Sequence, residues 1–414
     1  MRTAIVVLSA LWWLAQALLH LRTRSALPKL RDLNAPALPR WPKVSAVIPA
    51  RNEEAHLAAA LEAKRADGYP ELELVVVNDR STDRTGAIAD ELAARDPRLR
   101  AVHVTALPDG WLGKVNALQR GLEQASGEWI LFSDADVHLA PGTLVTLISW
   151  AELNDIDHVT IFPGIRARGP LIAPALASFA RFLTTLLRLW RVPDPKSNVS
   201  VGAGAFQLFR RRSLDATAGL EWLKMEIGDD MALGMMLKRA GARQAIVVGG
   251  DEVGLEFYPS FISMAHALEK NGAAAPLPAL LFGLTGYAAC EAGFVLGFGT
   301  SVGWLSALTL LIAAATQWST GRWLAVPAWP AMVPWFGALP LTAVLLRSAV
   351  LAFVRGGVNW RDTFYSTQVV REGMRVGKKE AGGVSPLPRS GGGGVTPPTA
   401  VLAPPASPDR TSSP

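Results

Sequence analysis

Long apolar stretches lie near both ends of this chain, and they constrain its fold more than any other feature. Residues 4–21 are almost wholly apolar and are close to the minimum length of a membrane-spanning helix. Residues 277–354 are apolar again, although Gly, Pro and Arg322 interrupt them. Half of all residues are hydrophobic and only 18% are charged, whereas soluble proteins carry about 25% charged residues. The sequence therefore predicts a soluble core flanked by membrane helices.

The first apolar stretch has more basic residues after it than before it. Arg22 and Arg24 follow it directly, where an anionic inner leaflet attracts basic side chains. Ala15-Gln16-Ala17 resembles a cleavage site, so a cleaved signal peptide is the alternative. The charge asymmetry favours a retained anchor over residues 1–22, with its C-terminal side in the cytoplasm.

In the middle of the chain, residues 43–275, short continuous apolar runs alternate with stretches whose apolar residues recur at helical spacing. Between short apolar runs lie stretches with apolar residues at three- and four-residue spacing, which predicts alternating strands and helices. This alternation indicates an α/β fold with a parallel, doubly wound sheet. Ligands of such sheets bind beyond the carboxyl ends of the strands, so we expect the chemistry there. The predicted strands are residues 44–48, 72–77, 100–104 and 129–132.

Three further segments have distinctive compositions. Residues 171–192 carry Arg181, Arg188 and Arg191 in one predicted helical stripe, which fits either a membrane-interface helix or a core helix. Residues 277–355 hold two to four membrane helices, and an even number returns the following residues to the side where the first anchor ends. Residues 378–414 are rich in Gly, Pro and Ser, which predicts a disordered tail.

Several functions are excluded by composition and missing motifs. The net charge is +6, but no long basic run with interleaved aromatics indicates nucleic-acid binding. Cys290 is the single cysteine, so no disulfide forms within the chain, and a small apolar filler is its simplest role. No G-x-G-x-x-G follows the first strand, and residues 110–114 lack the spacing of a P-loop.

Acidic residues follow two of the predicted strands. Asp79 ends the second strand, where a carboxylate accepts hydrogen bonds from a base or ribose; helix capping explains the neighbouring Thr82 and Asp83 but not Asp79. Asp134 and Asp136 follow the fourth strand and, in an extended chain, point to the same side. Such a pair predicts a site for Mg²⁺ or Mn²⁺, ions that also bind a diphosphate, whereas a chance surface pair is the alternative.

A second acidic pair, Asp229 and Asp230, comes directly before a predicted helix that Gly241 ends. Capping a helix needs only one carboxylate. The other is therefore available to take a proton from an acceptor hydroxyl.

These motifs occur in one order within residues 43–275: Pro-Ala-Arg-Asn-Glu-Glu, Asn-Asp-Arg-Ser-Thr-Asp, Asp-Ala-Asp and Gly-Asp-Asp. That order resembles the processive and lipid-directed family 2 glycosyltransferases, whose GT-A fold implies a doubly wound mixed sheet with flanking transmembrane helices. Residues 108–114 and 359–365 resemble stretches of the subgroup that glycosylates ceramide, hopanoid and carotenoid acceptors.

The resemblance implies an inverting transfer of a sugar from a UDP- or GDP-sugar, with Mg²⁺ or Mn²⁺ offsetting charge on the leaving nucleoside diphosphate. Asp230 is the implied general base, with Asp229 beside it, and Asp136 and Asp134 are the implied metal ligands. The implied nucleotide-binding residues are Pro49, Arg51, Glu53, Asp79, Lys114 and Asp134, and the acceptor side is Gly202, Gly204 and Phe206.

One departure from the family pattern bears on the acceptor. Polymer synthases and ceramide glucosyltransferases of this family carry a Q-x-x-R-W-type motif after the general base, but residues 266–271 read His-Ala-Leu-Glu-Lys-Asn. The departure argues against chain polymerisation and against ceramide as the specific acceptor. This favours single transfer to a lipid or other membrane-soluble acceptor of carotenoid, hopanoid or sphingolipid type over the alternative, a processive polysaccharide synthase. A non-enzymatic membrane protein with a decayed site fits poorly, because every expected carboxylate is present. We expect a multi-pass protein of the cell membrane with its catalytic domain in the cytoplasm.

Overall fold

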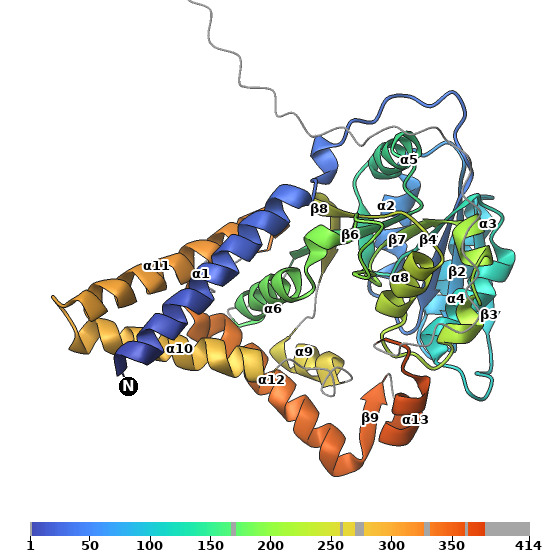
Figure 1. Cartoon of the computed structure of the whole chain (residues 1–414). Coiled ribbons are helices and arrows are strands. Elements are labelled where there is room, and N and C mark those ends of the chain that lie inside the picture. The colour runs from blue at the N-terminus through green and yellow to red at the C-terminus, as the bar shows by residue number, and fades with distance from the viewer. Residues whose placement is uncertain are drawn as a thin grey trace, which may run out of the picture.

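The computed structural model describes residues 2–166, 171–256, 260–269, 277–326, 332–360 and 363–376. It consists of an α/β unit beside a bundle of long helices (Figure 1). The tail predicted to be disordered, residues 378–414, lies outside the described residues.

The α/β unit is built on an eight-stranded sheet of order β3-β2-β1-β4-β7-β6-β8-β5. The four predicted strands, β1 to β4, are present and parallel to one another. The expectation of a wholly parallel sheet is wrong, because β7 runs antiparallel to β4 and β6, and β5 antiparallel to β8. The mixed sheet implied by the resemblance is confirmed. The strands are β1 (Val44–Ala50), β2 (Leu72–Asp79), β3 (Leu99–Val104), β4 (Trp129–Phe132), β5 (Val137–Leu139), β6 (His158–Arg166), β7 (Gln207–Arg210) and β8 (Gln244–Glu256).

Helices cover both faces of this sheet, and the central strands are therefore buried throughout. Alternate residues serve two cores: Ala46 and Ile48 of β1 point into one hydrophobic cluster and Val47 into the other. The helices of this unit are α2 (Leu57–Arg65), α3 (Thr85–Arg95), α4 (Gly113–Gln124), α5 (Thr143–Leu153), α7 (Arg211–Asp215) and α8 (Asp229–Arg239), with 3-10 turns η1 (Leu30–Asp32), η2 (Leu189–Arg191) and η3 (Leu220–Leu223).

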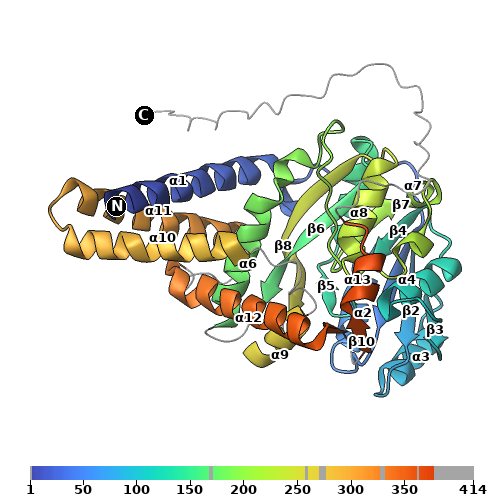
Figure 2. The same ribbon diagram turned by 60° about the horizontal axis from the view of Figure 1, so that its bottom comes forward.

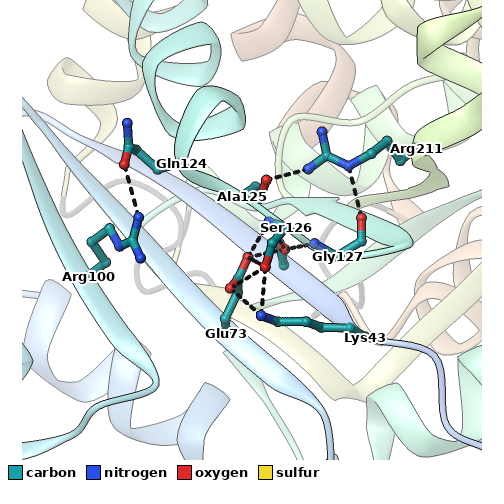
Figure 3. Close-up of polar contacts among 9 residues, drawn as sticks. Lys43, Glu73, Arg100, Gln124, Ala125, Ser126, Gly127 and Arg211 are labelled. Atoms are coloured by element: carbon teal, nitrogen blue, oxygen red, sulfur yellow. Dashed lines mark hydrogen bonds and ion pairs between the residues drawn. The ribbon is translucent and has the colours of Figure 1, made fainter.

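A polar cluster joins the amino ends of β1 and β2 to the segment that enters β4 (Figure 3). Glu73 accepts hydrogen bonds from Lys43 Nζ at 2.8 Å and from the backbone N of Ser126 at 2.6 Å. Burial opposes ionisation of Glu73, but its hydrogen bonds with Lys43, Ser45 and Ser126 outweigh this effect and lower its pKa to about 2. The cluster lies at the opposite edge from the carboxyl ends of these strands, so we assign it to stability.

By length and composition, four of the described helices are able to cross a membrane: α1 (Arg2–Ala26), α10 (Leu277–Leu296), α11 (Ser301–Leu324) and α12 (Pro334–Arg355). The flanking apolar helices are therefore confirmed, and three of them lie in the C-terminal region, where two to four were expected. Helices α1, α10 and α11 pack against one another, whereas α12 packs against α10 and α6 (Ile172–Leu186). The remaining elements are α9 (Phe261–Ala267), β9 (Gly357–Trp360), β10 (Thr363–Ser366) and α13 (Thr367–Gly373).

The predicted arginine stripe over residues 171–192 is wrong. Helix α6 ends at Leu186, and Arg188 has a left-handed backbone with φ of 49°, so the three arginines do not share one helical face. Arg181 is buried and stacks over Trp13 of α1 at 5.0 Å, whereas Arg188 and Arg191 are exposed. Because α6 also packs on α1, α11 and α12, it belongs to the helix bundle.

Candidate active site

Two loops at the carboxyl ends of β1 and β2 are joined by hydrogen bonds. Asn52 Oδ1 accepts from the backbone N of Thr82 at 2.9 Å, and the backbone N of Glu53 donates to Thr85 Oγ1 at 2.8 Å. Asn52 has φ of 55°, a conformation that Asn tolerates better than most residues. Two motifs about 30 residues apart in the sequence thus form one continuous surface, which the sequence analysis did not foresee.

Asp79 lies beside these loops, but its carboxylate is buried. Arg80 holds both oxygens, with Nε 2.7 Å from Oδ1 and Nη2 3.1 Å from Oδ2. A Cβ atom on Gly113 would lie 2.5 Å from Asp79 Oδ2, so the start of α4 packs directly on this carboxylate. The positive end of the helix dipole therefore faces Asp79. Its role in nucleotide binding stays a prediction.

A pocket at the same edge gathers predicted site residues from five different segments of the chain, among them Pro49 at the end of β1. Its polar lining includes Lys114 from α4, Asp134 after β4 and Gly204 before β7. Asp229 and Asp230 at the start of α8 complete this side. The full lining is Pro49, Lys114, Val115, Leu118, Phe132, Ser133, Asp134, Gly204, Gln207, Leu220, Leu223, Asp229, Asp230 and Leu233.

Lys114 is the cation at the centre of this pocket. Its Nζ donates to Asp134 Oδ1 at 2.7 Å. Burial disfavours the charged amine, but the carboxylates of Asp134, Asp229 and Asp230 outweigh burial and raise the pKa of Lys114. The amine is therefore a permanent positive charge, suited to bind phosphate oxygens.

Asp134 and Asp136 flank the buried Ala135 in a turn between β4 and β5, and not in the extended strand expected from the sequence. Burial and the charge of Asp134 raise the pKa of Asp136. Lys64 of α2 approaches from behind, where its Nζ donates to the carbonyl of Val137.

The sequence analysis missed Lys64, although a signal was present. The residue lies on the buried face of α2, in helical register with Leu57, Ala60 and Leu61. A lysine on an apolar helix face indicates a buried polar partner.

Asp230, the predicted base, is oriented by backbone donors. Its Oδ2 accepts from the backbone N of Gly204 at 2.8 Å, and its Oδ1 accepts from the backbone N of Met231 at 2.7 Å. Gly202 approaches even more closely, because a Cβ atom there would lie 1.8 Å from the carbonyl oxygen of Asp230. Position 202 therefore fits against α8 only without a side chain, whereas a Cβ atom on Gly204 would lie 2.8 Å from Lys114 Nζ.

Behind Asp230 runs a buried polar chain that the sequence analysis did not identify. Gln207 Nε2 donates to the Asp230 carbonyl at 3.0 Å, and Gln207 Oε1 lies 3.1 Å from His158 Nε2. Gln244 Nε2 lies 2.8 Å from His158 Nδ1 and donates to the Gly234 carbonyl at 2.6 Å. These contacts require a neutral imidazole protonated on Nε2, in line with burial lowering the pKa of His158 to about 4.

Some predicted residues lie outside this pocket. Phe206 is fully buried in the core cluster with β1 and β4, so its side chain does not line the pocket. Arg51 and Glu53 lie on the first loop, beside the pocket residues rather than among them. Their roles in binding nucleotide or acceptor stay predictions.

The turn that carries Asp134 and Asp136, which we call the acidic turn, offers the oxygen ligands that a hard divalent ion prefers. Among the residues that the structure describes, no group of three or more His, Cys, Asp or Glu side chains is arranged to hold a metal alone. Mg²⁺ is commonly held by one or two carboxylates and completed by substrate phosphates. Asp134 and Asp136 fit this second arrangement.

Comparison with known proteins agrees with this architecture. Residues 45–217 match the model of glycosyl transferase family 2. A mannosyltransferase from Pyrobaculum calidifontis, solved with GDP-Man and Mn²⁺, superposes with a TM-score of 0.50 and 21% identity, over 85% of this chain and 99% of that one. At this identity the likeness shows the fold alone.

Curated relatives align over shorter stretches. A beta-monoglucosyldiacylglycerol synthase from Synechocystis is 28% identical over 51% of this chain and 43% of its own length. A GalNAc(5)-diNAcBac-PP-undecaprenol beta-1,3-glucosyltransferase from Campylobacter jejuni is 33% identical over 27% of this chain and 35% of its own. The alignments with the first four relatives span 26% to 43% of those proteins.

The fold is therefore that of a GT-A glycosyltransferase with flanking apolar helices. The match of residues 45–217, the curated relatives and the fold together support a family 2 glycosyltransferase.

Proposed function

We propose that this chain transfers a sugar from a nucleotide-sugar donor to a lipid or other membrane-soluble acceptor, with inversion at the anomeric carbon. The observation that carries the proposal is the pocket in which Lys114 and Asp134, from the segment that matches family 2, converge with Asp229 and Asp230. The long apolar helices beside that domain support an acceptor that comes from a membrane.

In the proposed reaction, Asp230 is the general base. The acceptor hydroxyl gives its proton to the carboxylate of Asp230 while its oxygen attacks the anomeric carbon. The bond from that carbon to the diphosphate breaks, and the nucleoside diphosphate leaves with the electron pair. The backbone N–H groups of Gly204 and Met231 hold the carboxylate in one orientation before substrate arrives.

Lys114 and an ion held by the acidic turn would stabilise the negative charge that develops on the leaving diphosphate. Asp136 and Asp134 would hold Mg²⁺ or Mn²⁺, and a bound ion supplies positive charge at the diphosphate oxygens. Asp134 accepts a hydrogen bond from Lys114 Nζ at 2.7 Å. We propose that Lys114 turns from Asp134 toward the phosphates when the donor binds.

The proposed placement in the membrane follows from where the chain enters and leaves the α/β unit. After α1 the chain joins this unit directly, since the backbone N of Val248 in β8 donates to the Pro28 carbonyl at 2.9 Å. After α12 it returns to the same unit, where Gly373 packs on Met225. An even number of membrane crossings must therefore lie between these points, although α10, α11 and α12 are three helices.

We infer that α12 enters and leaves the membrane on one side. Near its start, the indole Nε1 of Trp335 donates to Glu291 in the distal half of α10, at 3.0 and 2.9 Å from its two oxygens. Ten residues later, Leu345 shares a cluster with Leu280 near the start of α10. Helix α12 thus runs back along α10 toward the α/β unit, and α10 and α11 are the crossing pair. The cytoplasm is the proposed side of the α/β unit, as Arg22 and Arg24 indicate.

A partition assay tests the proposed function. Membranes that contain the full chain receive labelled UDP- and GDP-sugars with Mn²⁺ and a mixed lipid extract. We expect label to enter the organic phase with one donor, and excess EDTA to abolish the transfer. Label in an insoluble high-molecular-weight fraction would instead favour the polysaccharide synthase. Label in neither fraction with any donor would contradict the proposal.

A further inference from the structure

After its last long helix, the chain returns to the α/β unit. Strands β9 and β10 form an antiparallel hairpin directly after α12, and α13 follows. Figures 1 and 2 show this red segment beside the α/β unit, at the end of α12 that points away from the other long helices. We call residues 363–376 the C-terminal strap.

The strap is fixed by a buried carboxylate. Glu226 is 2% exposed, and its Oε2 accepts from the backbone N of Arg375 and, at 3.3 Å, from that of Val376. Its Oε1 accepts from the backbone N of Gly228 at 3.0 Å. The Arg375 guanidinium donates to the Trp222 carbonyl at 3.1 Å and lies 5.6 Å from the centre of the Trp222 ring. The strap is therefore bonded to the loop that leads directly into Asp229 and Asp230.

At the other end of the strap, Tyr365 lies beside predicted donor-site residues. Its half-buried ring packs against the hydrophobic cluster beneath α4. Burial raises the pKa of Tyr365, while a hydrogen bond with Thr363 and the charges of Arg80 and Arg51 oppose that shift. The charge of Asp79 acts on the same hydroxyl. These charges belong to residues that end or follow β1 and β2, and the cluster against which the Tyr365 ring packs includes Val77 of β2 and Leu112 directly before α4.

This combination of groups suits a nucleoside diphosphate. An aromatic ring stacks on a base of any identity. Guanidinium groups such as Arg51 bind phosphate oxygens, and a carboxylate such as Asp79 accepts hydrogen bonds from a base or ribose. Anchoring the strap does not require Tyr365, because Glu226 and Arg375 already supply that function.

We propose that Tyr365 contacts the donor nucleoside and that the C-terminal strap forms one wall of the donor site. The proposal rests on the proposed function, since it names a binding residue for that donor. It also means that a segment beyond the membrane helices completes a site that the family 2 domain begins.

Nucleotide binding to the purified full-length chain in detergent tests this proposal. The Kd values of UDP and of GDP with Mn²⁺, and the donor KM and kcat, are measured for the wild type, Tyr365→Leu and Tyr365→Phe. Tyr365→Leu keeps apolar packing but removes stacking, so we expect Kd and KM to rise about tenfold with little change in kcat. Tyr365→Phe should retain wild-type binding. Phe364→Ala, an exposed position on the opposite face of the same strand, is the matched control and should change Kd less than about twofold.

Three outcomes decide the proposal. A tenfold loss of binding in Tyr365→Leu, with an unchanged unfolding midpoint, supports it. Wild-type Kd in that variant overturns the role of Tyr365 and leaves the proposed transferase function intact. A wild-type chain that binds neither nucleotide and transfers no sugar overturns both.

Discussion

Two buried lysines hold the acidic turn from opposite sides. Lys114 bonds to Asp134 at the front, and Lys64 bonds to the carbonyl of Val137 behind. Burial lowers the pKa of Lys64 to about 8, although the charges of Asp136 and Asp134 oppose the shift. The pKa of Lys114 is raised, because three carboxylates surround it. The positive charges of Lys64 and Lys114 therefore favour the ionised form of Asp136, against the effects of burial and of Asp134.

The buried chain behind Asp230 gives a prediction at the same scale. Gln207→Leu removes the donor to the Asp230 carbonyl and leaves His158 Nε2 with only the Thr160 hydroxyl, at 3.3 Å, as an acceptor. We expect kcat to fall about tenfold, the cost of one lost buried hydrogen bond, with donor KM unchanged. Steady-state kinetics on the partition assay measures both. Gln119→Leu, on the exposed face of α4, is the control, and an equal loss there would contradict a positioning role for Gln207.

Single residues show how far the sequence was informative. Asp134, Asp229 and Asp230 were identified from strand and helix ends, Lys114 was implied by the family resemblance, and the structure brings all four into one pocket. Gln207 escaped notice because a buried amide has no sequence signature until the partners of its strand are known.

At the scale of elements, β1 and β2 are joined to each other at both ends by different sets of contacts. Hydrogen-bonded loops join their carboxyl ends, and the Glu73 cluster joins their amino ends. The Glu73 cluster fixes the spacing of β1 and β2, and these strands carry the hydrogen-bonded loops at their other ends. We therefore expect loss of the Glu73 cluster to lower the stability of the fold more than it weakens substrate binding.

Glu73→Gln tests this division. The pKa of Glu73 is lowered to about 2 from an ordinary value of 4.5, so its stabilising effect is full above pH 4.5 and is lost as pH falls toward 2. At neutral pH we expect a cost of about 2 kcal/mol and a melting temperature lower by about 5 °C. Thermal unfolding of both proteins should converge as the pH is lowered. Glu71→Gln, at an exposed position nearby, is the control, and a pH-independent difference would exclude the ionised carboxylate as the cause.

The elements differ in how well the sequence predicted them. β1 to β4 are continuous apolar runs buried on both faces, so the hydrophobic pattern identified them. β8 was missed because Gly249, Gly250, Asp251 and Glu252 interrupt its apolar pattern. Its register also shifts at Phe162 and Pro163 of the partner strand, an irregularity that no local pattern predicts.

In the whole molecule, the α/β unit and the helix bundle are joined at more than one place. Leu27 after α1, Val326 after α11 and Val248 of β8 share a hydrophobic cluster at one junction. The C-terminal strap forms another through Glu226. The long apolar helices therefore lead into both the sheet at β8 and the loop before Asp229.

Cysteine labelling in sealed vesicles tests the proposed crossings. In a Cys290→Ser background, Asp109→Cys and Phe364→Cys should react with an impermeant reagent from the same side, because α12 does not cross. Phe298→Cys, at the exposed turn between α10 and α11, should react only from the other side. Labelling of Asp109→Cys and Phe364→Cys from opposite sides would show that α12 crosses and would contradict the arrangement.

Asp230→Asn measured for both transfer and donor binding tests the central claim most directly. The substitution removes the proton acceptor and keeps the shape of the side chain, while one of its two backbone donors, Gly204 or Met231, loses its acceptor. We predict that transfer of label into lipid falls by about 10²- to 10⁴-fold, while the Kd of the nucleoside diphosphate with Mn²⁺ stays within about twofold of the wild-type value. Transfer at the wild-type rate in a folded Asp230→Asn protein would contradict the account, because the pocket would then lack its base.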